Sequence, residues 1–127
     1  MATGVYEGGM MRVALTAATD TTGGGVLSLA NPEGIDLLIT RFILNVTTQS
    51  TGAGTVDAGI AANGTTSNDT LIDGKSVAAA GVFDNIEDQG TNGKSTVKWG
   101  ASQFVTVTAS ADLTGLVGEA LISYVPA

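Results

Sequence analysis

Apolar and polar residues alternate with a period of two in several short segments of the chain, which is the pattern of half-buried β-strands. The clearest of these segments lie at residues 11–17, 26–30, 37–48, 56–61, 97–99, 104–109 and 117–125. Turns rich in Gly, Asn and Asp separate them at intervals of roughly ten to fifteen residues. The spacing predicts an all-β fold, an antiparallel, jelly-roll-like β-sandwich of about eight strands. A closed barrel has the same alternation and stays open as an alternative.

Residues 37–48 are the strongest of these segments. Strict alternation divides their apolar side chains between two faces, one with Leu38, Phe42, Leu44 and Val46 and the other with Leu37, Ile39 and Ile43. The first face is continuously apolar, whereas the second also carries Arg41 and Asn45. We expect a central strand that packs on the core with its first face and on a loop or a neighbouring subunit with its second. Leu37, Ile39 and Ile43 are therefore the predicted subunit contacts.

The length of 127 residues suits one domain with its own core, which we assign to residues 10–127. Residues 1–9 are small, polar and rich in glycine, and they predict a flexible N-terminal arm. Such an arm is either a frayed end of the chain or a segment that becomes ordered on a neighbouring subunit. No signal peptide is visible at this end, and the apolar residues 35–46 are too few and too interrupted to cross a bilayer.

The net charge of -7, from 12 acidic and 5 basic residues, bears on the partners. Nucleic acids and anionic membranes attract basic patches, so we expect neither as a partner. Charged residues make up only 13% of the chain while hydrophobic residues reach 43%. This balance favours a protein that buries surface against copies of itself or a partner. The alternative is a monomer whose surface is built from Thr, Ser, Asn and Gly.

Histidine and cysteine are absent from the chain, which removes disulfides, thiolate chemistry and any serine triad with a histidine base. Two segments, Gly74–Ser76 and Gly93–Ser95, resemble the end of a phosphate-binding loop. Asp69 and Asp88 stand where such a loop needs its first glycine, so we interpret both segments as turns. We expect no enzyme and assign no catalytic, cofactor-binding or metal-binding residues, although composition alone does not exclude a Ser–Lys dyad.

Two further features have structural and functional interpretations. Asp84, Glu87 and Asp88 could bind Ca²⁺, but their spacing does not match an EF-hand loop and favours a solvated acidic loop. Trp99 alternates with Val97 on a short strand. We expect Trp99 in the core or in an interface, not in a sugar-binding platform.

Four stretches of sequence resemble small β-rich head proteins of tailed bacteriophages. They are GGGVLSLANPEG, LLITRFILNVTTQSTGAGTVDAGIAANGTTSNDTLIDG, VFDNIEDQGTNGKSTVKWGASQFVTVTAS and LTGLVGEALISYV. Together they extend over residues 23–125 and contain no diagnostic motif. The resemblance implies a capsid decoration, or cement, protein. Such proteins typically sit on the outside of the shell as trimers at three-fold axes and clamp adjacent major capsid subunits.

The resemblance implies a non-enzymatic virion structural protein that is made in the host cytoplasm and located on the capsid surface. Its partners would be the major capsid protein and two further copies of itself in a homotrimer. Residues 1–9 and the polar loop 84–93 are the candidates for touching the capsid, and no cofactor or site residue carries over. The alternatives are a tail or head-fibre module of the virion and a Ca²⁺-dependent carbohydrate-binding β-sandwich.

Overall fold

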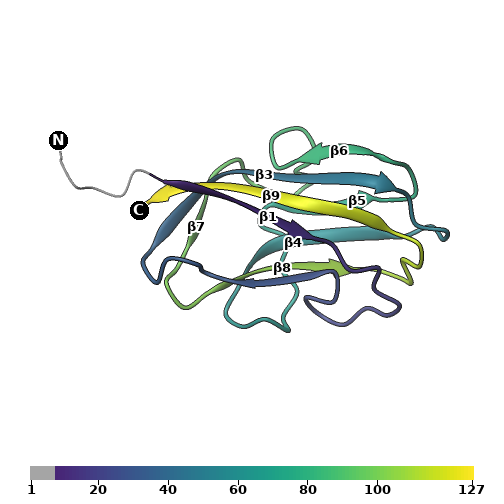
Figure 1. The fold of residues 1–127 in the computed structure, drawn as a ribbon, viewed down its shortest axis with the longest axis horizontal. Helices are drawn as coiled ribbons and strands as arrows, with labels where there is room; N and C mark the ends of the chain where they lie inside the picture. Colours follow the sequence, from purple (N-terminus) through teal and green to yellow (C-terminus); the bar gives the residue numbers. More distant parts are fainter. Residues whose placement is uncertain (1–7) are drawn as a thin grey trace.

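The computed structural model describes residues 8–127, which contain nine β-strands and no helix (Figure 1). The strands are β1 (Gly9–Ala14), β2 (Leu27–Ala30), β3 (Leu37–Thr48), β4 (Thr55–Ala61), β5 (Ile72–Ser76), β6 (Gly81–Asp84), β7 (Val97–Trp99), β8 (Phe104–Ala109) and β9 (Val117–Pro126). Residues 1–7 of the predicted arm lie outside the described residues. Gly9, its last residue, is the first residue of β1.

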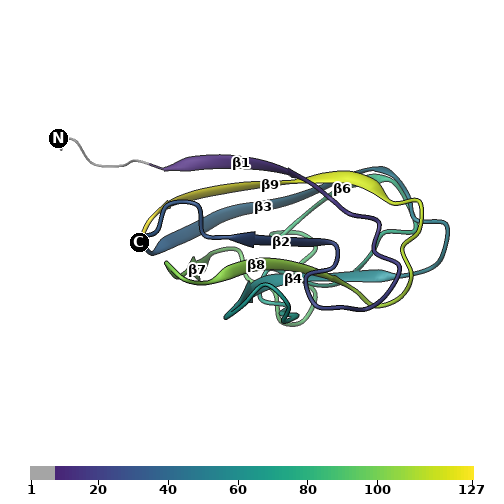
Figure 2. The same cartoon turned by 60° about the horizontal axis from the view of Figure 1, so that its bottom comes forward.

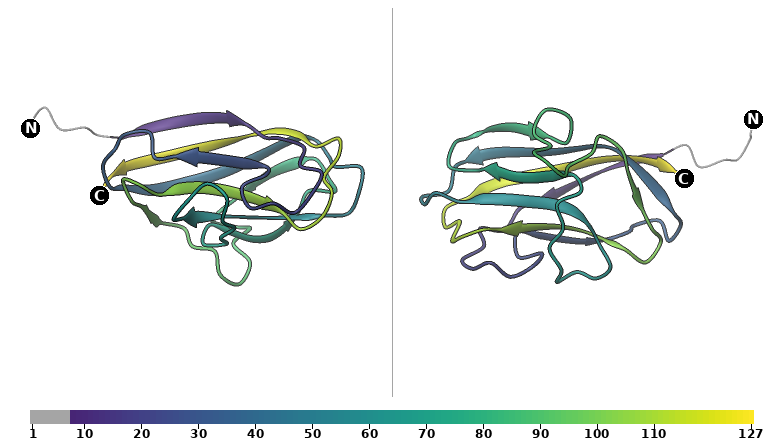
Figure 3. Two further views of the ribbon diagram at one scale, coloured as in Figure 1. Left: turned by 90° about the horizontal axis from the view of Figure 1, so that it is seen from below. Right: turned by 180° about the vertical axis from the view of Figure 1, so that it is seen from behind.

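The strands form two antiparallel sheets that face each other, as Figures 2 and 3 show. One sheet has the order β1-β9-β3-β6 with β7 also paired to β3, and the other has the order β2-β8-β4-β5. Every connection crosses between the sheets except β4–β5 and β6–β7. The prediction of an all-β antiparallel sandwich is confirmed, with nine strands in place of about eight.

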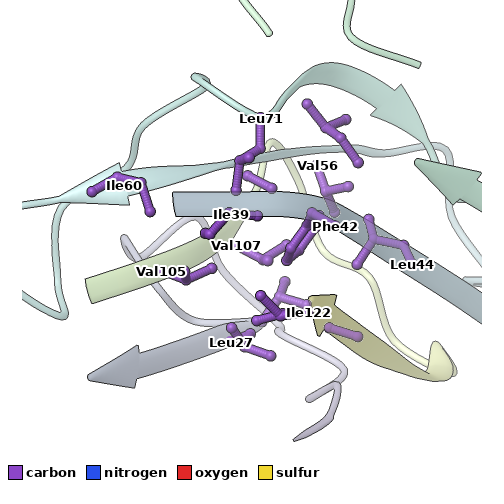
Figure 4. Packing of buried hydrophobic residues seen from close by; sticks show 14 of the residues in the cluster. Leu27, Ile39, Phe42, Leu44, Val56, Ile60, Leu71, Val105, Val107 and Ile122 are labelled. Atoms are coloured by element: carbon purple, nitrogen blue, oxygen red, sulfur yellow. The ribbon is translucent and has the colours of Figure 1, made fainter. Parts of the chain in front are cut away.

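The core fills the space between the two sheets (Figure 4). Its largest fully buried side chains include Trp99, Phe42, Leu37, Ile39 and Leu44. The indole Nε1 of Trp99 donates a hydrogen bond to the carbonyl of Gln103 at 3.0 Å, so the one polar atom of this ring is paired. The ring of Tyr124 meets the Trp99 ring edge-on at a centroid distance of 6.2 Å. Trp99 is therefore a core residue.

A β-bulge in β3 overturns the predicted division of its faces. Ile39 pairs with Tyr124 of β9 and Arg41 pairs with the next residue, Ser123, so Thr40 is an extra residue on β3. An extra residue reverses the alternation that follows it. Leu37 and Ile39 therefore point into the core with Phe42, Leu44 and Val46, and all five are buried. Leu38, which the sequence placed in the core, lies on the opposite face with Ile43, where both are half-buried.

At the level of this bulge, Asn85, which follows β6, links β3 to the segment before β7. Along one edge of β3, residues 37–39 pair with β7 and residues 43–46 pair with β6, which leaves Phe42 between the two partners. The Oδ1 atom of Asn85 accepts a hydrogen bond from the Phe42 amide at 2.8 Å, and the Asn85 amide donates to the Phe42 carbonyl. Its Nδ2 donates to the carbonyls of Lys94 and Ser95. The fully buried Asn85 side chain thus fills the gap between the strands.

The prediction that Gly74–Ser76 is a turn is wrong, because these residues belong to β5. Gly74 has a φ of +74°, and β5 uses one more residue than β4 between their paired positions, so the segment contains a bulge. The Nζ of Lys75 lies 3.0 Å from Asp88 and 4.6 Å from the centre of the Phe83 ring. Gly93–Ser95 lies in the loop before β7. Neither lysine belongs to a phosphate-binding loop.

Replacing Asn85 with Ala should lower the free energy of unfolding by about 3 kcal/mol, because the amide of Phe42 loses its acceptor inside the protein. Urea denaturation at neutral pH measures the change. The matched control is Asn92→Ala, which removes an exposed amide that bonds to Asp69. We expect the control to cost less than about 1 kcal/mol. Equal losses from the two variants would contradict the role assigned to Asn85.

Two neighbouring substitutions test the bulge in β3. Ile39→Ala should cost about 3 kcal/mol because it opens a cavity between the sheets. Leu38→Ala removes a half-buried side chain from the outer face and should cost less than about 1.5 kcal/mol. Both values come from the same urea denaturation measurement. Strict alternation without a bulge would produce the reverse order.

Candidate assembly surface

The face of the β1-β9-β3-β6 sheet that points away from the core is rich in apolar side chains, and we call it the outer face. The strand register places seven large apolar residues on it: Met10, Leu38, Ile43, Val82, Val117, Leu121 and Val125. Three of them are strongly exposed, with exposed fractions of 61% for Met10, 67% for Val82 and 54% for Val117. Apolar exposure that is spread over four neighbouring strands is typical of a surface that binds another protein.

Neighbouring strands bring these side chains together in rows. Leu121 of β9 lies directly opposite Ile43 of β3, and Val125 lies opposite Leu38. Opposing residues in an antiparallel pair have Cβ atoms about 5 Å apart, so each pair makes a continuous apolar contact on the outside of the sheet. On β6, Val82 lies opposite Asn45. The apolar rows therefore extend from β9 across β3. On β6, Asp84 lies opposite Ile43, so Val82 adds a separate apolar position to this face.

The charges on and beside the outer face balance one another. Three ion pairs are present, namely Arg12–Glu119 at 3.4 Å, Arg41–Asp84 at 2.8 Å and Lys98–Asp36 at 3.2 Å. These pairs use three of the five basic residues of the chain. The whole net charge of -7 therefore resides in the other residues. A partner that approaches the outer face meets little net repulsion from it.

The opposite sheet differs because its own chain covers its outward side. The hydroxyl of Thr106 on β8 donates to the carbonyl of Thr66 at 2.8 Å, and Thr106 is fully buried although it points away from the core. Gly59 on β4 lies so close to this loop that a Cβ atom would come within 2.7 Å of the Thr70 amide nitrogen. Residues 62–70 thus pack on this sheet. Within residues 8–127, the chain covers one outward face of the sandwich and leaves the other, which is rich in apolar residues, bare.

Only one of the three predicted subunit contacts lies where the sequence placed it. Leu37 and Ile39 are fully buried between the sheets, so they cannot touch another subunit. Ile43 is on the outer face, as predicted. Leu38 takes the place of the other two because of the bulge at Thr40. Leu121 and Val125 join the surface from β9, a contribution that only the pairing of distant strands reveals.

The predicted capsid-contact loop 84–93 is a compact turn. The Oδ1 of Asp84 accepts hydrogen bonds from the amides of Ile86 and Glu87, each at 2.8 Å. The bond from Glu87 is the main cause that holds the pKa of the Asp84 carboxyl below its ordinary value, and Arg41 adds to the effect. Asp88 accepts from the Asp84 amide and pairs with Lys75. The loop therefore presents Ile86, which is 50% exposed, from a fixed position.

Two of the three carboxylates that the sequence suggested for Ca²⁺ are paired with basic side chains of the protein. Asp84 and Asp88 bind Arg41 and Lys75, and within residues 8–127 no group of three acidic residues could hold a metal ion. A shallow cavity of about 190 Å³ lies elsewhere, lined by Asp57, Ser67, Asn68 and Asp69. Burial raises the pKa of Asp57, and the charges of Asp73 and Asp69 act in the same direction.

Within the described part of the chain, no helix is long and apolar enough to cross a membrane. No protein-family model matches this sequence, and no curated protein matches it. A solved structure described as "Capsid of Ralstonia phage GP4" is similar, with a TM-score of 0.59 and 17% sequence identity. The similarity covers 100% of this chain and 89% of that chain. At this identity it shows that the two chains share a fold over nearly their whole lengths.

Proposed function

We propose that this chain is a non-enzymatic structural protein of a phage virion, a decoration protein on the outer surface of the capsid. The observation that carries the proposal is the similarity of the complete fold to a chain from a phage capsid. The resemblance of residues 23–125 to small phage head proteins supports the same role. A decoration protein needs a stable fold and contact surfaces, and the sandwich with its bare outer face offers both.

The proposed assembly is a homotrimer in which the outer face supplies the subunit contacts. Removing its apolar side chains from water favours association by about 25 cal/mol for each Å² buried. The paired charges of Arg12 with Glu119 and of Arg41 with Asp84 let two such faces approach without a net like charge. The acidic remainder of the surface then stays in solvent, which favours solubility at high copy number.

The proposed contacts with the major capsid protein are residues 1–9 and the loop 84–93. In the loop, the hydrogen bonds of Asp84 and Asn85 fix the backbone, and Ile86 is the apolar side chain at its surface. A contact made by a rigid loop loses little conformational freedom on binding. A protein that binds only the assembled shell shifts the equilibrium towards that state, which is how decoration would stabilise a capsid.

Light scattering of the purified protein tests the trimer. We expect three times the mass of one chain for the wild type and a monomer for Ile43→Glu and for Val82→Glu, because each variant places a carboxylate in the apolar contact. The matched control is Ala62→Glu, which adds the same charge at an exposed position in the loop after β4 of the other sheet and should leave the trimer intact. Identical masses for the control and the two outer-face variants would contradict the assigned contact surface.

Co-sedimentation with empty capsids of the same phage that lack this protein tests the decoration role. We expect the wild type to sediment with the capsids and Ile86→Glu to bind at least about tenfold more weakly, as a carboxylate at an interface centre disfavours binding. Glu87→Gln at the next position is the control and should bind like the wild type. Absence of any binding by a correctly folded wild type would exclude decoration and favour another virion component.

A further inference from the structure

β1 forms an open edge of its sheet. It pairs with β9 over all six residues without a bulge, and Figure 2 shows it at the border of the sheet. The Leu15 amide donates to the Gly118 carbonyl of the β9 side. Because hydrogen bonds alternate along an antiparallel strand, the amides and carbonyls of Met10, Arg12 and Ala14 point away from β9. Thr16 is the next residue of this series, and its outward amide donates a hydrogen bond to the carbonyl of Val26.

The other edge strands are protected in ways that β1 is not. β5 contains the bulge at Gly74, β6 and β2 have four residues each, and β7 has three. Bulges and short lengths are the usual means by which proteins prevent an edge from pairing with another chain. β1 is longer, regular and free of proline. Among the edges in residues 8–127, it is the one suited to receive a further strand.

We infer that the outward edge of β1 pairs with β1 of a second copy of this chain, antiparallel and about a two-fold axis. An antiparallel edge is complementary to itself, since each copy offers the same alternation of donors and acceptors. Charge also favours a second copy. Arg12 is the one charged residue between Gly8 and Thr19, so two copies of a chain with a net charge of -7 meet here without opposing carboxylates.

The chemistry of the side chains disfavours one register and favours another. Pairing Arg12 with Arg12 of the second copy would place like charges directly opposite each other, which is destabilising. Shifting the second strand by two residues pairs Met10 with Arg12 of the second copy, and the reverse pair forms by symmetry. The exposed Met10 then lies along the aliphatic part of the arginine. In this register Met11 faces Met11 of the second copy on the two-fold axis.

The contact is small and shares Met10 and Arg12 with the border of the outer face. A pair of six-residue strands buries less than the roughly 1,000 Å² expected of a stable complex, so it forms where copies are concentrated. It does cover Met11 and Val13, whose inward side chains remain partly exposed beside the core. Its register is tested at positions 11 and 13, whose side chains point away from the outer face.

Single cysteines test the register cleanly because the chain has no cysteine of its own. Positions 11 of the two copies form a non-hydrogen-bonded pair with Cα atoms about 4.5 Å apart, within the range of a disulfide. Positions 13 would lie about 13 Å apart along the strands. Under mild oxidation of concentrated protein, Met11→Cys should therefore yield at least about tenfold more disulfide-linked dimer than Val13→Cys. Equal yields, or a larger yield from Arg12→Cys, would overturn the proposed register.

A second variant separates specific pairing from random collision. Met10→Pro, added to Met11→Cys, removes an outward amide and leaves the hydrogen bonds to β9 in place. We expect the dimer yield to fall about tenfold while the melting temperature changes little, as Pro is tolerated on the open side of an edge strand. Ala62→Pro in the same background is the control and should leave the yield unchanged. An unchanged yield with Met10→Pro would overturn pairing through β1.

Discussion

The extra residue at Thr40 in β3 determines which side chains build the interior of this sandwich. It brings Leu37 and Ile39 to the same side as Phe42, Leu44 and Val46, so that a single strand supplies five buried residues. A bulge interrupts the regular pairing of its strand, and here the interruption falls where β3 exchanges one partner strand for another. Asn85 restores the missing hydrogen bonds with its buried amide. The bulge and the asparagine form one arrangement, because the amide of Phe42 would otherwise be buried without a partner.

The sequence predicted the sandwich and most strands because alternation and turn residues are local signals. It failed where one residue changes the register. Leu37 and Leu38 are chemically identical neighbours, and only the count of residues across Thr40 decides which of them is buried. The prediction of a turn at Gly74 failed for a related reason, because a glycine with positive φ is found in turns and in β-bulges alike. Asn85 carried no signal either, because an asparagine in a polar loop looks solvated until the loop is seen to close on β3. The sequence predicted only part of the outer face. It identified Ile43 in β3, whereas Leu121 and Val125 come from a strand about eighty residues later in the chain.

The outward faces of the two sheets differ in whether the chain itself covers them. The β2-β8-β4-β5 sheet is covered by the chain itself, through Thr106, Gly59 and the loop 62–70. The β1-β9-β3-β6 sheet has no such cover within residues 8–127, and its outward side carries apolar residues with balanced ion pairs. The net charge is thus not spread evenly over the molecule. The charges on and beside the bare face balance one another, and the acidic excess lies elsewhere.

This distribution would let a strongly acidic chain associate through the proposed contacts. Two copies with a net charge of -7 repel each other, and the repulsion is weakest where charges are paired or absent. Both conditions hold on the same sheet, because Arg12 pairs with Glu119 on the outer face and no acidic residue occurs in β1. The face and the edge of a sheet point in perpendicular directions, so contacts through one leave the other accessible. Through the two proposed contacts together, a protein of this design would extend from a small assembly to a connected layer while its acidic side stays in solvent.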